Sequence, residues 1–465
     1  MNIKYDFATK EELELIHEKT LYLLKNVGVI FYGEEARELF KRYGARVEGE
    51  TVFLEENLIN QGLSTVIQKF EWFGRDSTIT IGDGATVYAP AYGPMYIYEN
   101  DEYHYPTPLD FSNFHKLDAS SKVISVGSPN IMDLPSIDAK IRSNYAMATT
   151  LMHHTKPVLG IVDGKKKATE CIKMTREFYD IHDKSVVCGL VDAASPFVYS
   201  GAMSEALVEY AKEGQIIVFT GTGMSGLTTP DTIASSILAI NVAMIAGIVL
   251  AQLINPGTPV VYGNQGFGSD LRHSLLTVGS PEDGLISHTI KALGDFYHLP
   301  VRTGGCVSDA KDVDMQAGVE SFTSCFAALS AHTDLMFHTC GIMDSYNGLS
   351  YDKYIYDEEV AAMVYRFIRG YEVNEKTLMT DKLEKAGPGG NFIARTSKEY
   401  RNDYYLPNVP NRVSHGNWIA SGKPSIKDNT KKIYKERIAN YVLPELNAAQ
   451  KKILETYIPK EYMER

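Results

Sequence analysis

A short β-branched strand, a loop rich in glycine or proline, and then a helix recur from about residue 120 onwards. This repeat constrains the fold more than any other feature of the chain. Seven strands can be read directly, at residues 123–128, 156–162, 185–191, 215–221, 258–265, 299–307 and 334–342. Strands that alternate with helices predict a parallel sheet covered by helices. With one further unit that the pattern hides, the repeat predicts an α/β fold, a (β/α)8 TIM barrel with its core over 111–375.

The segments on either side of the repeat have a different pattern. Residues 1–110 begin with helical patterns at 11–26 and 34–43. They continue into a passage at 78–105 whose alternating apolar residues and Gly-rich turns predict β-hairpins. Residues 376–465 are rich in Gly, Pro and aromatic residues and end in a polar helix. We expect a helical and hairpin extension packed on the barrel, and a C-terminal cap that folds back on it.

A long apolar segment at 235–257 approaches the length of a membrane span. Asn241 and Gln252 interrupt it and Pro256 and Gly257 end it, which favours a buried core helix. The first residues are too acidic for a signal peptide. The formal net charge of -12, with no basic cluster, disfavours a nucleic-acid or anionic-membrane surface. We expect a cytoplasmic enzyme without a membrane anchor, and its apolar helix surfaces favour a homo-oligomer.

Metal and cysteine chemistry have weak signals in this sequence. Five cysteines without a CxxC pair disfavour a disulfide framework or a structural zinc site. Adjacent His153 and His154 would point to opposite faces of a strand, and His338 and Cys340 lack an evident third ligand. We therefore expect no metal. A nucleophilic Cys306, with His338 as its base, stays open as an alternative, as does weak phosphate binding by the glycines of 221–226.

The loops that follow the strands share the catalytic face of such a barrel. They are rich in Gly, Ser, Thr and Asn and carry few charges, at 192–196, 221–230, 264–273, 308–318 and 338–348. Aromatic side chains are the other candidates for substrate binding, because ring faces attract the positive charge of an onium group. Segments expected to border the barrel mouth supply these candidates: Trp72, Phe73, Tyr92, Tyr96, Tyr98, Phe219, Phe267 and Tyr346.

Five motifs in the same order resemble those of the trimethylamine methyltransferase superfamily. They are FTGTGMSGLTTP (219–230), AGIVLAQLINPGTPVVYG (246–263), GSPEDGLISHTIKALGDFYHLP (279–300), SDAKDVDMQAG (308–318) and AGPGGNF (386–392). The similarity extends from FGRD at 73–76 to GNWIASG at 416–422. The resemblance implies a (β/α)8 barrel that transfers a methyl group from a methylamine to the cobalt of a separate corrinoid protein. It implies no tightly bound cofactor in this chain.

Val307 distinguishes this chain within that superfamily. The archaeal members that act on trimethylamine carry pyrrolysine just before SDAK, and Val307 stands at that position here. The chain thus resembles the non-pyrrolysine branch, whose known members demethylate quaternary amines such as glycine betaine to the tertiary amine dimethylglycine. A quaternary ammonium is already an electrophile with a neutral leaving group, so attack by Co(I) on its methyl carbon needs no proton transfer.

The expected substrate is glycine betaine, and it gives roles to polar residues near Val307. Arg302 can bind the substrate carboxylate bidentately, and His338 can add a hydrogen bond. The remaining candidates are expected to order the following loop or to face the corrinoid protein: Asp309, Lys311, Asp314 and Gln316. Proline betaine, carnitine and γ-butyrobetaine stay as alternative substrates. A barrel that binds onium compounds or a corrinoid protein without catalysis is the alternative from another class.

Overall fold

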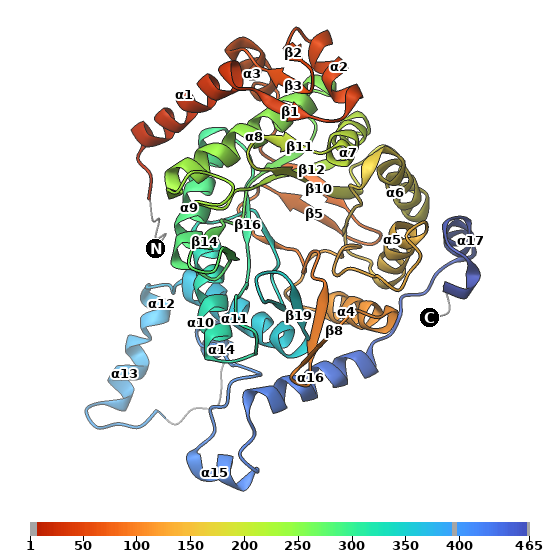
Figure 1. Cartoon of the computed structure of the whole chain (residues 1–465). Coiled ribbons are helices and arrows are strands. Elements are labelled where there is room, and N and C mark those ends of the chain that lie inside the picture. The colour runs from red at the N-terminus through yellow and green to blue at the C-terminus, as the bar shows by residue number, and fades with distance from the viewer. Residues whose placement is uncertain (1–6, 393–397, 463–465) are drawn as a thin grey trace.

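The computed structural model describes residues 7–392 and 398–462, and its centre is a ring of parallel strands surrounded by helices (Figure 1). Seven positions in the ring are regular strands, and residues 125–127 occupy one position without regular strand structure. In chain order the strands are β6 (Val87–Tyr88), β9 (Val158–Leu159), β10 (Val187–Ala194), β12 (Ile216–Thr222), β13 (Val260–Tyr262), β16 (Arg302–Gly304) and β17 (Leu335–Phe337).

Backbone pairing closes the ring. Strands β9, β10, β12 and β13 pair in parallel, and β16, β17 and β6 do the same. Parallel bridges join Tyr262 to Val301 and Gly127 to Val158. The amide of Ser125 donates to the carbonyl of Tyr88 at 2.8 Å, which links residues 125–127 to β6. The (β/α)8 barrel predicted from the strand–helix repeat is confirmed.

The strand–helix unit that the sequence pattern hides is the first one, which begins with strand β6. It lies inside the 78–105 passage that we expected to contain only hairpins, and two residues are too few to show a periodicity. The barrel therefore begins before residue 111, within the range assigned to the extension. The strands after β6, β7 (Tyr96–Glu99) and β8 (Glu102–His104), do form a hairpin. This hairpin pairs with β19 (Gly348–Ser350), which connects the loops after the first and last barrel strands.

Eight helices, one after each ring position, form the outer layer (Figure 1). They are α4 (Pro108–Ser120), α5 (Arg142–His153), α6 (Gly164–Tyr179), α7 (Gly201–Lys212), α8 (Ile233–Ile254), α9 (Pro281–Phe296), α10 (Met315–Ser330) and α11 (Tyr351–Arg369). Among the residues described, α8 alone is long and apolar enough to cross a membrane, and 89% of its most apolar window is buried. Its Asn241 donates to Thr20 and to Tyr297, so α8 is a core helix whose polar group is satisfied.

Side chains along the barrel strands alternate between the interior and the helix layer. Leu190, Val218 and Leu335 belong to the interior cluster, whereas Val191 and Phe219 belong to the larger cluster that includes the helices. Two strands before the barrel, β4 (Phe70–Phe73) and β5 (Thr78–Ile81), form a hairpin whose residues also enter the interior cluster. This alternation decides which side chains can reach a site inside the barrel.

The β4–β5 hairpin closes the amino end of the barrel. The amide of Phe73 donates to Ser185, just before β10, and the amide of Asp76 donates to Thr155, just before β9. Trp72 is fully buried in the interior cluster. We expected Trp72 and Phe73 to border the barrel mouth, and they lie at the opposite end, because the hairpin packs under the strands rather than over their carboxyl ends.

The N-terminal segment packs on the outside of the barrel. Its elements are α1 (Lys10–Asn26), β1 (Val29–Phe31), α2 (Glu34–Arg42), β2 (Arg46–Glu48), β3 (Thr51–Phe53) and α3 (Glu56–Leu63). Strand β1 pairs in parallel with β11 (Val198–Tyr199), and the ring of Phe31 stacks on that of Tyr199 with centroids 4.6 Å apart. Helices α1 and α2 match the ranges expected from their apolar periodicity. They extend the outer layer of the barrel beside α7 and α8.

The C-terminal segment follows the outside of the helix layer (Figure 1). Short helices α12 (Glu375–Leu378), α13 (Thr380–Ala386), α14 (Lys398–Asp403) and α15 (His415–Ala420) lie at the periphery. The chain then returns, so that α16 (Ile426–Asn440) packs on α11 and α4, and α17 (Ala448–Tyr457) packs on α6. Arg437 of α16 pairs with Glu358 of α11, which fixes this return.

Candidate active site at the carboxyl end of the barrel

Arg302 occupies the first position of β16 and lies inside the barrel. Its guanidinium is 4.9 Å from the centroid of the Phe337 ring, an interior side chain of β17. Only 2% of Arg302 is exposed, and its side chain has no hydrogen bond or ion pair within residues 7–392 and 398–462. Burial lowers its pKa to about 10, so it remains charged at neutral pH. A buried cation without a partner costs several kcal/mol, roughly, which an anionic ligand would offset.

His338 and Tyr346 form an aromatic wall beside Arg302. His338 directly follows β17, is 6% exposed, and its ring centroid lies 4.8 Å from that of Tyr346. The ring of Phe267 continues the wall, 6.0 Å from Tyr346. Burial, and then the charge of Arg302, hold the pKa of His338 well below its ordinary value. The imidazole is therefore neutral and can donate one hydrogen bond without adding positive charge.

Gln265 lies across the end of β16, and the sequence did not single it out. A Cβ atom at Gly304 would overlap the side chain of Gln265, so this arrangement requires glycine at position 304. Gln265 is 3% exposed. Two motifs in the sequence mark these positions, NQG shortly after β13 and the glycine pair after Thr303. Neither motif reveals that the side chain of Gln265 lies across β16.

Asp192 is the acidic residue of the site, and the sequence placed it only within a loop. It lies on β10, and the hydroxyl of Thr222 on β12 donates to its Oδ2 at 2.9 Å. Burial raises its pKa to about 6, while the Thr222 hydrogen bond and the charge of Arg302 lower it. Tyr92, in the loop after β6, is close enough to interact electrostatically with Asp192. The Tyr92 ring lies 6.2 Å from that of Phe337, which places it at the same end of the barrel.

Several polar atoms at this end share one property: each is buried and has no hydrogen-bond partner among the residues described. They are Gln265 Oε1 and Nε2, Arg302 Nε, His338 Nδ1 and the Tyr346 hydroxyl. Because more than about 90% of buried polar groups in native proteins are paired, such a group of exceptions indicates that a polar ligand belongs there. A cavity of about 370 Å³ also opens beside Tyr92 and Asn130.

The loop that carries Val307 is held from behind by a buried ion pair. Val307 is fully buried, and its amide donates to Ser324 at 3.3 Å. The ammonium of Lys353 donates to the carbonyl of Cys306 at 3.0 Å and to Asp357 at 2.6 Å. Lys353 and Asp357 are both 0% exposed. Position 307 is therefore fixed by α11 and cannot shift without breaking this network.

The polar residues after Val307 divide into anchors and surface positions. Asp309 accepts from the amide of Val278 at 3.1 Å and from Ser345 at 2.6 Å, which joins three loops. Lys311 pairs with Asp344 at 3.0 Å. Two more make hydrogen bonds within their own helix: Asp314 accepts from Ala317 as the N-cap of α10, and Gln316 donates to Glu320 at the surface.

Phe219, Tyr96 and Tyr98 are not brought into the group around Arg302. Phe219 faces α8, because a Cβ atom at Gly247 would lie 2.6 Å from its ring. Our assignment of Phe219 to substrate binding was wrong, since the alternation along β12 turns its side chain away from the interior. Tyr96 and Tyr98 belong to β7 at the rim, where Tyr98 donates to Asp312 at 2.8 Å.

Two alternative chemistries do not fit the geometry. Cys306 is fully buried, its thiol contacts the carbonyl of Asp357, and burial raises its pKa well above the ordinary value. A thiol in that state is a poor nucleophile. In the 221–226 loop the amides of Met224 and Gly226 donate to Thr228 and Thr229 of the same turn, so they do not point at a phosphate.

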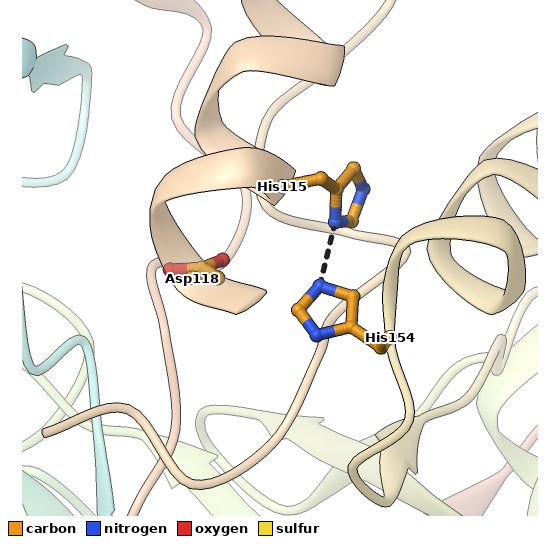
Figure 2. A group of neighbouring side chains, drawn as sticks. All are labelled: His115, Asp118 and His154. Atoms are coloured by element: carbon orange, nitrogen blue, oxygen red, sulfur yellow. Dashed lines mark hydrogen bonds between the residues drawn. The ribbon is translucent and has the colours of Figure 1, made fainter. Parts of the chain in front are cut away.

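A second cluster of polar side chains lies where α4 approaches the residue that follows α5 (Figure 2). His115 and Asp118 come from α4, and His154 directly follows α5 before β9, so His153 and His154 are not in a strand as we expected. One potential ligand atom from each of His115, Asp118 and His154 lies within 4.8 Å of the others. The sequence missed this cluster because 39 residues separate the two histidines.

The contacts within this cluster describe a hydrogen-bonded histidine pair. His115 Nδ1 and His154 Nε2 are 3.1 Å apart (Figure 2). Thr150 donates to the carbonyl of Ala146, so its oxygen accepts from His115 Nε2, which assigns the donor role between the rings to His154. Burial holds the pKa of both histidines well below the ordinary value, and the charge of Lys156 lowers that of His154 further. The positive charge of Lys156 also makes a second positive charge at the cluster unfavourable.

The curated proteins that match nearly the whole chain include one from Desulfitobacterium hafniense and two from Eubacterium limosum. The glycine betaine methyltransferase of Desulfitobacterium hafniense is 33% identical, over 96% of this chain and 94% of its own length. The proline betaine:corrinoid methyltransferase of Eubacterium limosum is 36% identical, over 98% of each. The L-carnitine:corrinoid methyltransferase of the same organism is 36% identical, over 98% of this chain and 97% of its own length.

Among solved structures, the monomethylamine methyltransferase of Methanosarcina barkeri has a similar fold, with a TM-score of 0.50 at 14% identity over 93% of each chain. The family model described as trimethylamine methyltransferase (MTTB) matches residues 2–464. The order of the motifs, the closed barrel and these matches agree. This chain belongs to the trimethylamine methyltransferase (MTTB) family.

Proposed function

We propose that this protein moves a methyl group from a quaternary amine that carries a carboxylate, glycine betaine first, to the Co(I) of a corrinoid held by a separate protein. The observation that carries the proposal is Arg302, a buried guanidinium without a hydrogen bond or ion pair in the described parts of the chain. A carboxylate offers such a group two parallel hydrogen bonds and a balancing charge. The names of the three relatives support the same substrate class.

The unpartnered groups beside Arg302 complete the carboxylate site. Gln265 can donate through its amide nitrogen, and neutral His338 can donate through one ring nitrogen. Hydrogen bonds from residues on or just after three strands, β13, β16 and β17, fix the carboxylate and so orient the rest of a small substrate. The methylated nitrogen then lies among the rings of Tyr92, Phe267 and Tyr346, whose faces attract its positive charge.

The reaction at the nitrogen is an in-line displacement. Co(I) supplies an electron pair to one methyl carbon, the carbon–nitrogen bond breaks, and its electrons leave on nitrogen as a neutral tertiary amine. No proton moves, so an acid–base pair is not needed. The protein contributes by holding the methyl group in an attack geometry, which contributes up to roughly 7–11 kcal/mol.

Val307 fits this reaction because it supplies no functional group. Its side chain is apolar and fully buried, and its loop is anchored through Cys306 and Lys353. A permanently charged substrate brings its own leaving-group activation, whereas an uncharged amine does not. We therefore propose that trimethylamine is not a substrate.

We further propose that the enzyme acts in the cytoplasm, where Co(I) can be kept reduced, and as a homo-oligomer. The proposal of a homo-oligomer rests on large apolar side chains that the C-terminal segment exposes to solvent. Examples are Tyr371 at 78%, Val373 at 68% and Tyr404 at 60%. Exposed apolar groups of this number on one segment are typical of a protein–protein contact.

A substrate panel tests the proposed function. The protein is mixed with Co(I) cobalamin and glycine betaine, proline betaine, carnitine or γ-butyrobetaine, and the methyl-Co(III) spectrum is followed. The expected result is methylation with glycine betaine that Arg302→Ala and His338→Ala reduce strongly, with folding checked by circular dichroism. Methylation by another member of the panel would reassign the substrate within the class. Betaine binding without any methylation would identify a non-catalytic onium-binding barrel.

A further inference from the structure

Two opposite charges lie in the same end of the barrel without pairing. Arg302 extends from β16 and Asp192 from β10, and each affects the pKa of the other. No ion pair joins the two side chains within residues 7–392 and 398–462. Buried charges in proteins are normally paired directly or hold a ligand. The two charges therefore act on one interior without neutralising each other directly, and a ligand with both signs of charge would balance both.

We propose that Asp192 is the counter-ion of the substrate's quaternary nitrogen, so that the site binds a zwitterion through one fixed charge at each end. This inference rests on the proposed function, and it adds a binding residue to it. The carboxylate of Asp192 is oriented by Thr222, whose hydroxyl donates to Oδ2 at 2.9 Å. The other oxygen, Oδ1, makes no hydrogen bond within the described ranges and is free to face the ligand.

A quaternary ammonium group is recognised without hydrogen bonds, since its nitrogen carries no proton. The faces of aromatic rings and negative charges attract it strongly. The structure provides both together, because Tyr92 lies close enough to Asp192 to interact electrostatically. Tyr92 and Asp192 are each partly accessible to solvent, whereas Arg302 is buried below them. The carboxylate of the ligand thus enters first, and the methylated nitrogen stays nearer the mouth.

The pair of charges also determines which molecules the site rejects. A simple carboxylate would satisfy Arg302 and leave Asp192 unbalanced, with repulsion between the two anions. A simple amine cation would satisfy Asp192 and leave Arg302 without a partner. Specificity that arises from leaving a buried charge unpaired is strong, because the penalty falls only on the wrong ligand. The site is matched to a ligand whose net charge is zero.

Asp192 is expected to affect binding rather than the chemical step. The positive charge on nitrogen disappears as the carbon–nitrogen bond breaks, so a nearby carboxylate stabilises the bound substrate at least as much as the transition state. An interaction of this type lowers KM and does not raise kcat. Asp192→Asn should therefore raise KM for glycine betaine about tenfold or more without lowering kcat.

Calorimetry with two ligands tests the assignment directly. The ligands are glycine betaine and 3,3-dimethylbutyrate, in which carbon replaces the charged nitrogen at nearly the same size. The wild-type protein should bind glycine betaine at least about tenfold more tightly. Asp192→Asn should remove that preference by weakening glycine betaine alone. The matched control is Asp231→Asn, the same change at an exposed position in the loop after β12, and it should leave both affinities unchanged.

The outcomes separate this inference from the proposed function. If Asp192→Asn binds glycine betaine as tightly as the wild type, or weakens both ligands equally while remaining folded by circular dichroism, Asp192 is not the counter-ion. Cobalamin methylation by the wild type is measured on the same preparation. Methylation together with an unaffected Asp192→Asn variant overturns only the inference. Loss of the betaine preference in Asp192→Asn without any methylation by the wild type overturns only the proposed reaction.

Discussion

Arg302 and Asp192 face the same interior at the carboxyl end of the barrel and do not form an ion pair within the described chain. The separation is built into the strands. Arg302 is at the first position of β16, whereas Asp192 is near the end of β10 and is turned toward Thr222 on β12. A site with two separated charges is unfavourable when empty, and it becomes favourable with a zwitterion between them.

Replacing Arg302 should change activity and stability in opposite directions. Arg302→Met keeps the volume of the side chain and removes a buried, unpartnered charge. We expect glycine betaine turnover to fall about 100-fold or more, because the carboxylate loses a charge-assisted bidentate partner. The free energy of unfolding should rise, by on the order of 1 kcal/mol. Urea denaturation and the cobalamin assay measure both, and a variant that is less stable and equally active would contradict the assignment.

Gly304 should tolerate no side chain, because Gln265 crosses it. In Gly304→Ala the new methyl group would overlap the Gln265 side chain and displace its amide from the carboxylate site. We expect KM for glycine betaine to rise about tenfold, for the loss of about one hydrogen bond to a charged group. The control is Gly201→Ala at the start of α7, where no atom lies within 4 Å of the added methyl. Equal steady-state kinetics for the two variants would show that Gln265 does not contact substrate.

The buried Lys353–Asp357 pair should contribute to the stability of the loop that carries Val307. Lys353→Met leaves Asp357 buried and uncompensated and removes the hydrogen bond to the Cys306 carbonyl. We expect the free energy of unfolding to fall by about 3–5 kcal/mol. Lys432→Met breaks an exposed pair with Glu436 and should change it by less than about 0.5 kcal/mol. A small effect at Lys353 in chemical denaturation would mean that the loop is held by other contacts.

Binding of glycine betaine should weaken as the pH falls through about 6. Asp192 has a pKa raised to about 6 by burial, so it is ionised above that pH and loses its charge below it. Arg302, Tyr92 and Tyr199 interact electrostatically with it, and none of them changes charge between pH 5 and 8. Burial and the charge of Arg302 also hold the pKa of His338 well below its ordinary value. Calorimetry from pH 5 to 8 should show this decrease in the wild type and not in Asp192→Asn.

The barrel and the identity of Arg302 and His338 as site candidates were predictable from the sequence for a physical reason. Parallel strands buried on both faces give continuous apolar runs, and the residues at their carboxyl ends meet at one edge. The two-residue strand β6 was not predictable, because so short an element has no periodicity. Phe219 was wrongly assigned to substrate binding because an unbroken apolar run does not reveal which residues face the interior.

Gln265 and Asp192 could not be predicted as site residues from the chain alone. Gln265 matters because a glycine on a neighbouring strand leaves space for it, and that relationship spans 39 positions and two elements. Asp192 followed an apolar strand and looked like a turn residue. Its role depends on a cation contributed by β16, which is distant in sequence. Pairs of this kind are properties of the closed barrel rather than of any local pattern.

The central claim is that a permanently charged nitrogen held opposite Arg302 donates its methyl group without help from position 307. The most direct measurement offers Co(I) cobalamin with the protein and either glycine betaine or trimethylamine, and it quantifies methyl-Co(III) and the amine product. We predict one equivalent of dimethylglycine for each methyl-Co(III) formed from glycine betaine, and no methylation from trimethylamine. Comparable rates with trimethylamine, or no methyl transfer from any betaine of the panel, would contradict the account.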